Sequence, residues 1–174
     1  LLLYSKGEAK PHEFIINIGD KFVHTIQVAE ESGDNITLFG MYQLKSGKNV
    51  NGYFLASINK NTKQIKLNNI NAFPEDLLTL VEKDKQGSDN EKNPGLGSLF
   101  SLAQVVTREN EEKDYILEYQ LRMVRTYRSN NDTYTTLEYY YGDIIDINIK
   151  PNGTHVIARI PKLQVSSHTP ALSV

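Results

Sequence analysis

Hydrophobic and polar residues alternate in short runs along most of the chain, and turn-forming residues separate the runs. A period of two places apolar side chains on one face of an extended strand. β-Branched and aromatic residues dominate the runs, whereas Gly, Asn, Ser and Pro bound them, which is typical of strands joined by hairpins. The pattern predicts strands at residues 13–18, 22–29, 36–44, 52–59, 64–67, 99–107, 115–127, 134–141, 144–149 and 154–160.

One segment between the two series of strands has a helical pattern. Pro74 suits the first turn of a helix, acidic residues follow it, and lysines lie near its end. Leu77, Leu78 and Val81 form one apolar stripe, which predicts an amphipathic helix of about three turns. Residues 86–97 are rich in Asn, Gly, Ser and charge, and we expect them to form a flexible loop.

The helix and the loop separate two similar halves of the chain. Residues 52–65 align with residues 143–156 without a gap, and residues 27–38 align with residues 105–117 with one insertion. Strand, turn and strand coincide in both alignments, so each half is predicted to be a meander of about four antiparallel strands. The predicted organisation is a first β-meander at 1–72, a helix and flexible loop at 73–97, and a second β-meander at 98–174.

The spacing of strands and turns resembles a known kind of repeat. A charged turn precedes a strand at residues 115–118, and the stretch at residues 142–149 leads through a Pro-Asn-Gly turn to a last strand that ends in Ile160-Pro-Lys. This order resembles the β-propeller-like repeats of large uncharacterised bacterial envelope proteins. The resemblance implies an all-β fold with one short helix, and an extracytoplasmic, non-enzymatic module. It carries over no functional residue.

The chain also departs from an ordinary propeller blade. The hairpin at residues 115–149 is longer than blade strands normally are, and the chain contains no Trp. Two antiparallel meanders that resemble blades are therefore the predicted architecture, and a closed β-barrel or a β-sandwich is the alternative.

Composition restricts the classes of function. Hydrophobic residues make up 39% and charged residues 23%, as in ordinary globular proteins. The net charge of -2 offers no broad positive field for a polyanion, so we expect no nucleic acid partner. No apolar run approaches the roughly 20 residues that cross a bilayer. The absence of Cys excludes disulfides, thiolate metal sites and cysteine nucleophiles.

No motif for catalysis or for a cofactor occurs in the sequence, and we expect the protein not to be an enzyme. The histidines are scattered, and the acidic clusters lack the spacing of a calcium loop. Asp143 and Asp146 lie three residues apart in a predicted strand, which directs them to opposite faces. Glu118 and Glu138 are the carboxylates on which a glycoside hydrolase would depend if they approached each other.

The most informative predicted surface is the long hairpin. A turn centred near residues 130–131 would place Arg122 opposite Tyr139, and Gln120 opposite Tyr141, all on one face. Tyrosine and arginine together can hold a sugar ring or a peptide by stacking, cation–π attraction and hydrogen bonding. Arg122, Tyr139 and Tyr141 are therefore the predicted ligand-binding residues.

The opposite face of that hairpin is more apolar, and we expect it to belong to the core. Its residues are Tyr119, Leu121, Met123, Tyr134 and Tyr140. A register slip of one residue would exchange the two faces.

The expected function is that of a structural or interaction module of a larger, extracytoplasmic protein. Edge strands of isolated meanders invite pairing, so the expected partner is the rest of the same chain or a second copy in a homo-oligomer. A carbohydrate- or peptide-binding module and a glycoside hydrolase fragment are the alternatives.

Overall fold

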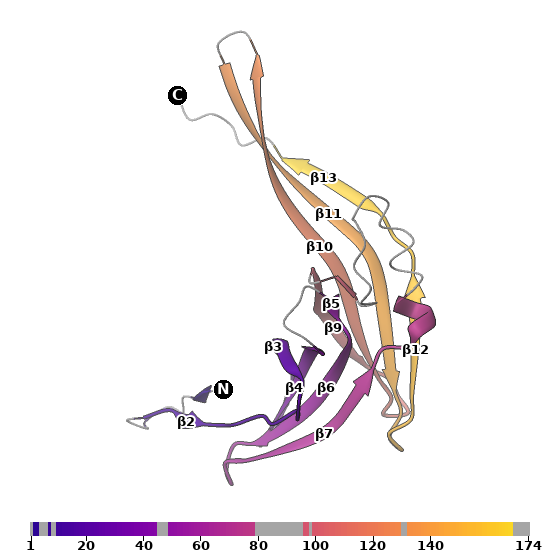
Figure 1. The fold of residues 1–174 in the computed structure, drawn as a ribbon. Coiled ribbons are helices and arrows are strands. Elements are labelled where there is room, and N and C mark those ends of the chain that lie inside the picture. The colour runs from indigo at the N-terminus through magenta and orange to yellow at the C-terminus, as the bar shows by residue number, and fades with distance from the viewer. Residues whose placement is uncertain are drawn as a thin grey trace. The chain divides into compact units, whose positions relative to one another are not determined.

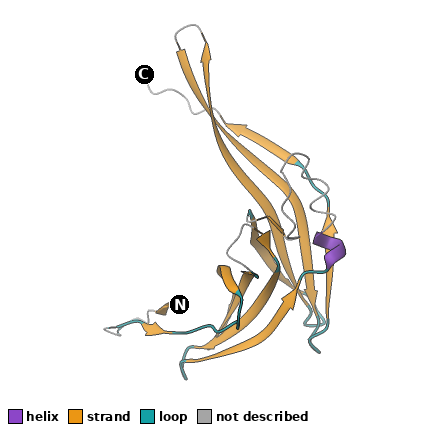
Figure 2. Cartoon of the chain, in the orientation of Figure 1, coloured by secondary structure: helices purple, strands orange, loops and turns teal. Residues whose placement is uncertain are grey.

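A computed structural model describes residues 2–3, 7, 10–44, 49–78, 96–97, 99–129 and 132–168. Within these residues the protein is all-β with one short helix, and its strands form antiparallel sheets (Figures 1 and 2). The chain divides into two compact units, residues 1–98 and residues 99–174. The predicted all-β fold of two antiparallel meanders is confirmed.

The first unit contains a four-stranded antiparallel sheet. Its order is β3 (Phe22–Ser32), β4 (Asn35–Gln43), β6 (Gly52–Asn59) and β7 (Gln64–Ala72). Spatial order follows chain order, so the sheet is a meander. Both central strands are buried along most of their length. This explains why β4 and β6 are almost continuously apolar, since each packs side chains on both faces of the sheet.

Two short strand pairs accompany this sheet. β1 (Leu2–Leu3) pairs with β2 (His12–Glu13), and β5 (Asn49–Val50) pairs with β8 (Leu96–Gly97). Leu96 is fully buried, so the last two residues of the predicted flexible loop belong instead to an ordered strand. The remainder of that loop, from residue 86 to 95, lies outside the described residues.

The helix is described over residues 75–78, where the Leu78 amide donates to the Pro74 carbonyl at 3.1 Å. Leu77 and Leu78 are buried, in agreement with the predicted apolar stripe. Val81, the third member of that stripe, lies outside the described residues.

The predicted strand at residues 13–18 is wrong for all but its first residue, Glu13, which belongs to β2. Residues 14–18, here called the strap, have no ladder partner among the described residues. Phe14 and Ile18 are buried, whereas Ile15 is 80% exposed. The alternation therefore has another cause, because one side of an extended segment packs against a sheet face without joining the sheet.

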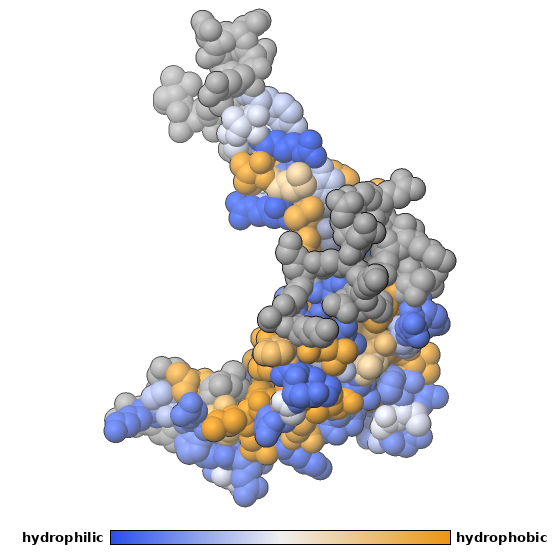
Figure 3. Space-filling view, in the orientation of Figure 1, coloured by the Kyte–Doolittle hydropathy of each residue, from blue (hydrophilic) through white to orange (hydrophobic). Residues whose placement is uncertain are grey.

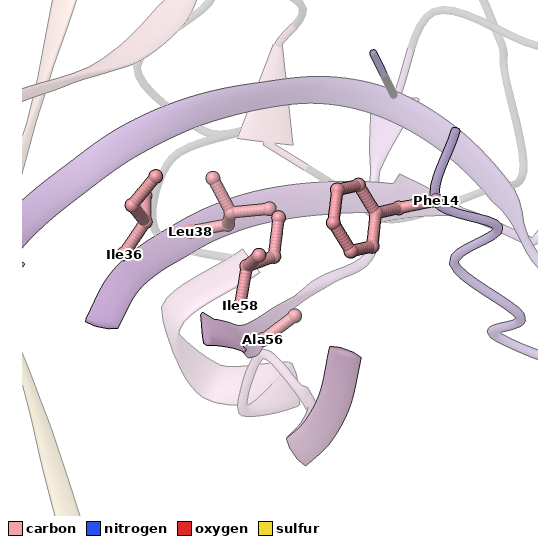
Figure 4. Close-up of a cluster of buried hydrophobic side chains, with 5 residues drawn as sticks. All are labelled: Phe14, Ile36, Leu38, Ala56 and Ile58. Carbon is pink, nitrogen blue, oxygen red and sulfur yellow. The ribbon is translucent and has the colours of Figure 1, made fainter. Parts of the chain in front are cut away.

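The strap packs on the face formed by even-numbered residues of β4 and β6. Figure 4 shows the ring of Phe14 beside aliphatic side chains of these two strands. Ile18 packs in a neighbouring cluster with Tyr42 and Phe54. On the opposite face of the sheet, the Tyr53 ring lies 5.7 Å from both the Phe39 and the Phe73 ring centroids. The residues that surround Phe14 are Ile36, Leu38, Ala56 and Ile58.

The second unit contains a five-stranded antiparallel sheet. Its order is β12 (His155–Ile160), β11 (Asp132–Ile149), β10 (Lys113–Ser129) and β9 (Phe100–Thr107), and β13 (Gln164–His168) also pairs with β11. The first four strands form a meander, as predicted. β13 was not predicted, because its sequence lacks the alternation of apolar residues seen in the other strands.

The predicted strands at 134–141 and 144–149 are one continuous strand, β11. The ladder shifts register between Glu118 and Gln120, which pair with Ile144 and Tyr141, so β11 accommodates an extra residue as a bulge and does not end. Gly142 lies at this bulge, where an added Cβ would come within 2.9 Å of the Tyr119 ring.

One face of the second sheet is buried in the part where β9 and β12 flank β10 and β11. Tyr115 pairs with Ile147, Leu117 pairs with Ile145, and all four side chains are at most 3% exposed. Among the strands that the structure describes, neither meander closes on itself, because β3 and β7 end the first sheet and β9 and β12 end the second. The closed β-barrel alternative is therefore wrong.

The two meanders share one strand order. The alignment of residues 52–65 with 143–156 places the β6–β7 turn on the β11–β12 turn. Common ancestry of the halves, and their likeness to propeller blades, remain predictions.

Candidate functional site on the β10–β11 ribbon

β10 and β11 continue as a pair beyond the strands on either side of them. Their ladder runs from Lys113 and Ile149 to Ser129 and Asp132. β9 accompanies β10 only as far as Tyr119, and β12 accompanies β11 only from Ile144 onward. We call the continuing part, residues 120–129 and 132–141, the ribbon. β13 lies along β11 in this part (Figure 1).

The predicted register of the ribbon is confirmed. Arg122 pairs with Tyr139, and Gln120 pairs with Tyr141. The three predicted ligand-binding residues therefore share one face of the ribbon, with Arg122 exposed and both tyrosines partly buried. Together with Gln120, these residues form what we call the tyrosine face.

Lys162 joins the tyrosine face from the segment between β12 and β13. Its Nζ lies 2.6 Å from Glu118 Oε1 and 5.6 Å from the centroid of the Tyr141 ring. Gln120 Nε2 donates to the second Glu118 oxygen at 3.0 Å. The hydrogen bond from Lys162 is the main cause that lowers the pKa of the Glu118 carboxyl, against the opposing effect of burial.

Sequence reasoning missed Lys162. It lies 44 residues from Glu118, and nothing in the residues around it marks it as a partner of a tyrosine. β13 adds further polar groups, because Ser166 pairs with Tyr139 and Gln164 pairs with Tyr141. The assembled face offers ring surfaces, cations and amide groups, which are the contacts that sugars and peptides use.

The prediction that the opposite face of the ribbon belongs to the core is wrong. Leu121 and Met123 are only partly buried, because the ribbon is too narrow to cover them. The same face carries a polar network in which Arg125 Nε lies 2.8 Å from Glu138 Oε2. The Tyr140 hydroxyl donates to that carboxylate at 2.6 Å and accepts from Arg125 Nη2 at 3.2 Å. Hydrogen bonding to Glu138 raises the pKa of Tyr140.

The two carboxylates of the hydrolase hypothesis do not face each other. The register places Glu118 with Arg122 on the tyrosine face and places Glu138 opposite Met123 on the other face. Each carboxylate is paired with a different cation, Lys162 or Arg125. A glycosidase requires two carboxyl groups on either side of one bond, and this pair does not provide that arrangement.

Asp114 and Asp146 form a second group of acidic residues, at the end of the β10–β11 ladder that lies away from the ribbon. Arg108 Nε donates to Asp114 Oδ2 at 2.7 Å and Asn148 Nδ2 donates to Asp114 Oδ1 at 2.6 Å. The Arg108 bond is the main cause that lowers the pKa of Asp114. Burial, and then the charge of Asp114, raises the pKa of Asp146, whose Oδ1 is buried without a hydrogen-bond partner in the described part of the chain.

No set of three or more His, Asp or Glu side chains within the described residues could hold a metal ion. Among the helical residues that the structure describes, none belongs to a helix long and apolar enough to span a membrane.

Comparison of the chain with family models, with curated proteins and with solved structures gives no match in any of the three. The fold thus defines the chain as an all-β protein of two antiparallel meanders. The resemblance to β-propeller-like repeats stays a prediction.

Proposed function

We propose that this chain is a non-enzymatic interaction module of a larger, extracytoplasmic protein, and that the ribbon is its contact surface. The observation that carries the proposal is the continuation of the β10–β11 ladder past the end of β9. The ribbon buries little apolar surface by itself, because only β13 accompanies it, and only along residues 137–141 of β11. Val124 is accordingly 62% exposed and Tyr127 is 48% exposed. The extracytoplasmic location depends on the resemblance to envelope-protein repeats.

The surface of the ribbon has the mixed character of an interaction surface. Figure 3 shows hydrophobic and hydrophilic residues interleaved along it. Interfaces that form and separate are about as apolar as the rest of a protein surface, with tyrosine and arginine enriched. The separation of Glu118 from Glu138 onto opposite faces supports the non-enzymatic part of the proposal.

Hydrogen exchange of the ribbon amides tests this function. The chain is compared with the intact product of its gene, and we expect the amides of residues 120–129 to exchange at least tenfold more slowly in the intact protein. The amides of Ile145 and Ile147, whose side chains are fully buried, provide the control and should exchange equally in both. Equal exchange at residues 120–129 in the two proteins would contradict a contact role for the ribbon.

A carbohydrate- or peptide-binding module is the second candidate. It is favoured by the register that places Arg122 opposite Tyr139, next to Tyr141 and its neighbour Lys162. The double substitution Tyr139→Ala and Tyr141→Ala should abolish binding in a glycan array. Tyr127→Ala is the matched control, because Tyr127 is an exposed tyrosine of the other face. Unchanged binding by the double variant would remove the tyrosine face from the proposal.

A further inference from the structure

The outer side of β10 carries backbone groups that face away from β11. The Gln120 amide donates to the Leu99 carbonyl at 3.0 Å, so the Gln120 backbone faces the side on which β9 lies. The pairing of β10 with β11 continues from Gln120 to Ser129 without another shift of register. Because backbone groups of alternate residues point to the same side of a strand, Arg122, Val124 and Thr126 also face that side.

This outer side of β10 is an unfilled strand position among the described residues. β9 pairs with residues 113–119 of β10, and no described strand pairs with the outer side of residues 121–129, which we call the open edge. The outer side of β11 differs, because β12 pairs with residues 144–149 and β13 pairs with residues 137–141. An added strand in line with β9 would pair with β10 as β13 pairs with β11.

The charge of the open edge disfavours a second copy of this chain as the partner. Arginine occurs at positions 122, 125 and 128, and residues 119–129 contain no Asp or Glu. Antiparallel pairing of two such edges would bring arginines of both copies together, and like charges on adjacent strands are destabilising. An acidic strand would instead complement the edge.

The two faces of the ribbon define the chemistry of that strand more closely. Leu121 and Met123 lie on the face where Arg125 is already paired with Glu138. Arg122 lies on the tyrosine face and is exposed. A complementary strand would therefore carry apolar residues next to Leu121 and Met123, and carboxylates next to Arg122.

We propose that the open edge binds an extended peptide segment that alternates apolar and acidic residues, by adding it as a strand in line with β9. This inference rests on the proposed function, because it names the partner of the ribbon. Main-chain hydrogen bonds from Arg122, Val124 and Thr126 would hold the segment. The side chains would select it.

Binding of a fluorescent nine-residue peptide of alternating Val and Glu tests the inference. Val124→Pro removes one outward N–H that β11 does not use, and it should weaken binding at least tenfold. Val124→Ala keeps that N–H and should bind within threefold of the unsubstituted chain. Circular dichroism and the thermal midpoint establish that both variants fold.

Charge reversal gives a second test that does not depend on proline being tolerated. Arg122→Glu should weaken binding of the Val/Glu peptide at least tenfold and strengthen binding of a Val/Lys peptide. Lys150→Glu makes the same change of charge in the exposed β11–β12 turn and should leave both affinities within threefold.

Two results would overturn the inference: no binding of the Val/Glu peptide, or equal binding of the Val/Glu and Val/Lys peptides. Slower exchange of the ribbon amides in the intact protein would then leave the proposed function standing while strand addition fails. Equal exchange in the intact protein would reject the contact role of the ribbon instead.

Discussion

The aromatic ring of Phe54 on β6 lies over Gly40, its cross-strand partner on β4, so closely that a Cβ at position 40 would come within 2.1 Å of Phe54 Cζ. A second glycine of the same strand pair, Gly52, is enclosed from two sides, because a Cβ there would lie 2.2 Å from the Asn71 carbonyl oxygen and 2.5 Å from the Tyr42 ring. Glycine inside a strand weakens the sheet unless another side chain occupies its place. Here an aromatic ring from the neighbouring strand occupies the place beside Gly40, and a ring together with a backbone carbonyl occupies the place beside Gly52.

Gly40→Ala should destabilise the chain by about 2 kcal/mol, because the added methyl group overlaps a buried ring. Urea-induced unfolding measures the change in the free energy of unfolding. Combining Gly40→Ala with Phe54→Leu should cost less than the sum of the two single changes, since the smaller side chain makes room. Strictly additive costs would argue against the close approach of Gly40 and Phe54.

The strap should contribute measurably to stability although it joins no sheet. Phe14→Ala should lower the free energy of unfolding by about 3 kcal/mol, because it empties a site where the ring is 4% exposed. Ile15→Ala is the matched control at the next residue, which is 80% exposed, and its effect should stay within about 0.5 kcal/mol. Similar effects of the two substitutions would contradict the packing of the strap.

The Glu118–Lys162 pair should make stability depend on pH. Glu118→Gln should cost up to about 1 kcal/mol at neutral pH, as expected for a partly exposed ion pair. Since the pKa of Glu118 is lowered in the folded protein, its contribution is present above the unfolded pKa and is lost as the pH falls through the folded pKa. The difference between the two proteins should therefore shrink below about pH 4 in urea titrations. Glu109→Gln, at an exposed turn residue, should change stability neither at neutral pH nor at the acidic end of the titration.

Asp146 should reduce stability at neutral pH. Its pKa is raised in the folded protein, so the cost of its charge is fully present above the folded pKa and disappears below the unfolded pKa. Asp146→Asn should raise the thermal midpoint at pH 7 by roughly 3 °C and leave it unchanged at low pH. Asp143→Asn is the contrasting variant and should lower the midpoint, because Asp143 pairs with Arg159 at 2.7 Å. A lower midpoint for Asp146→Asn at pH 7 would show that its carboxylate is stabilising.

The candidate site could be predicted from the sequence only where its contacts are local in the chain. Arg122 and Tyr139 belong to consecutive strands that lie two residues apart in the chain, so the place where one strand ends and the next begins sets their pairing. Lys162 reaches Glu118 through the path of the chain after β12, and no feature near either residue specifies that path. The open edge likewise depends on where other strands end. β9 stops pairing with β10 at Tyr119, whereas β13 covers β11 at residues 137–141, and only the structure shows this difference.

The sequence by itself determined that the chain forms antiparallel strands, that these make two meanders, and that Arg122 meets Tyr139, because periodicity and turns act between neighbours in the chain. Only the tertiary structure decided that the strap packs on a sheet face without pairing, that β11 passes through a bulge where a break was predicted, and that Glu118 and Glu138 lie on opposite faces. Alternation reports which side of a segment is buried. What buries it depends on contacts between residues far apart in the chain, which no local pattern specifies.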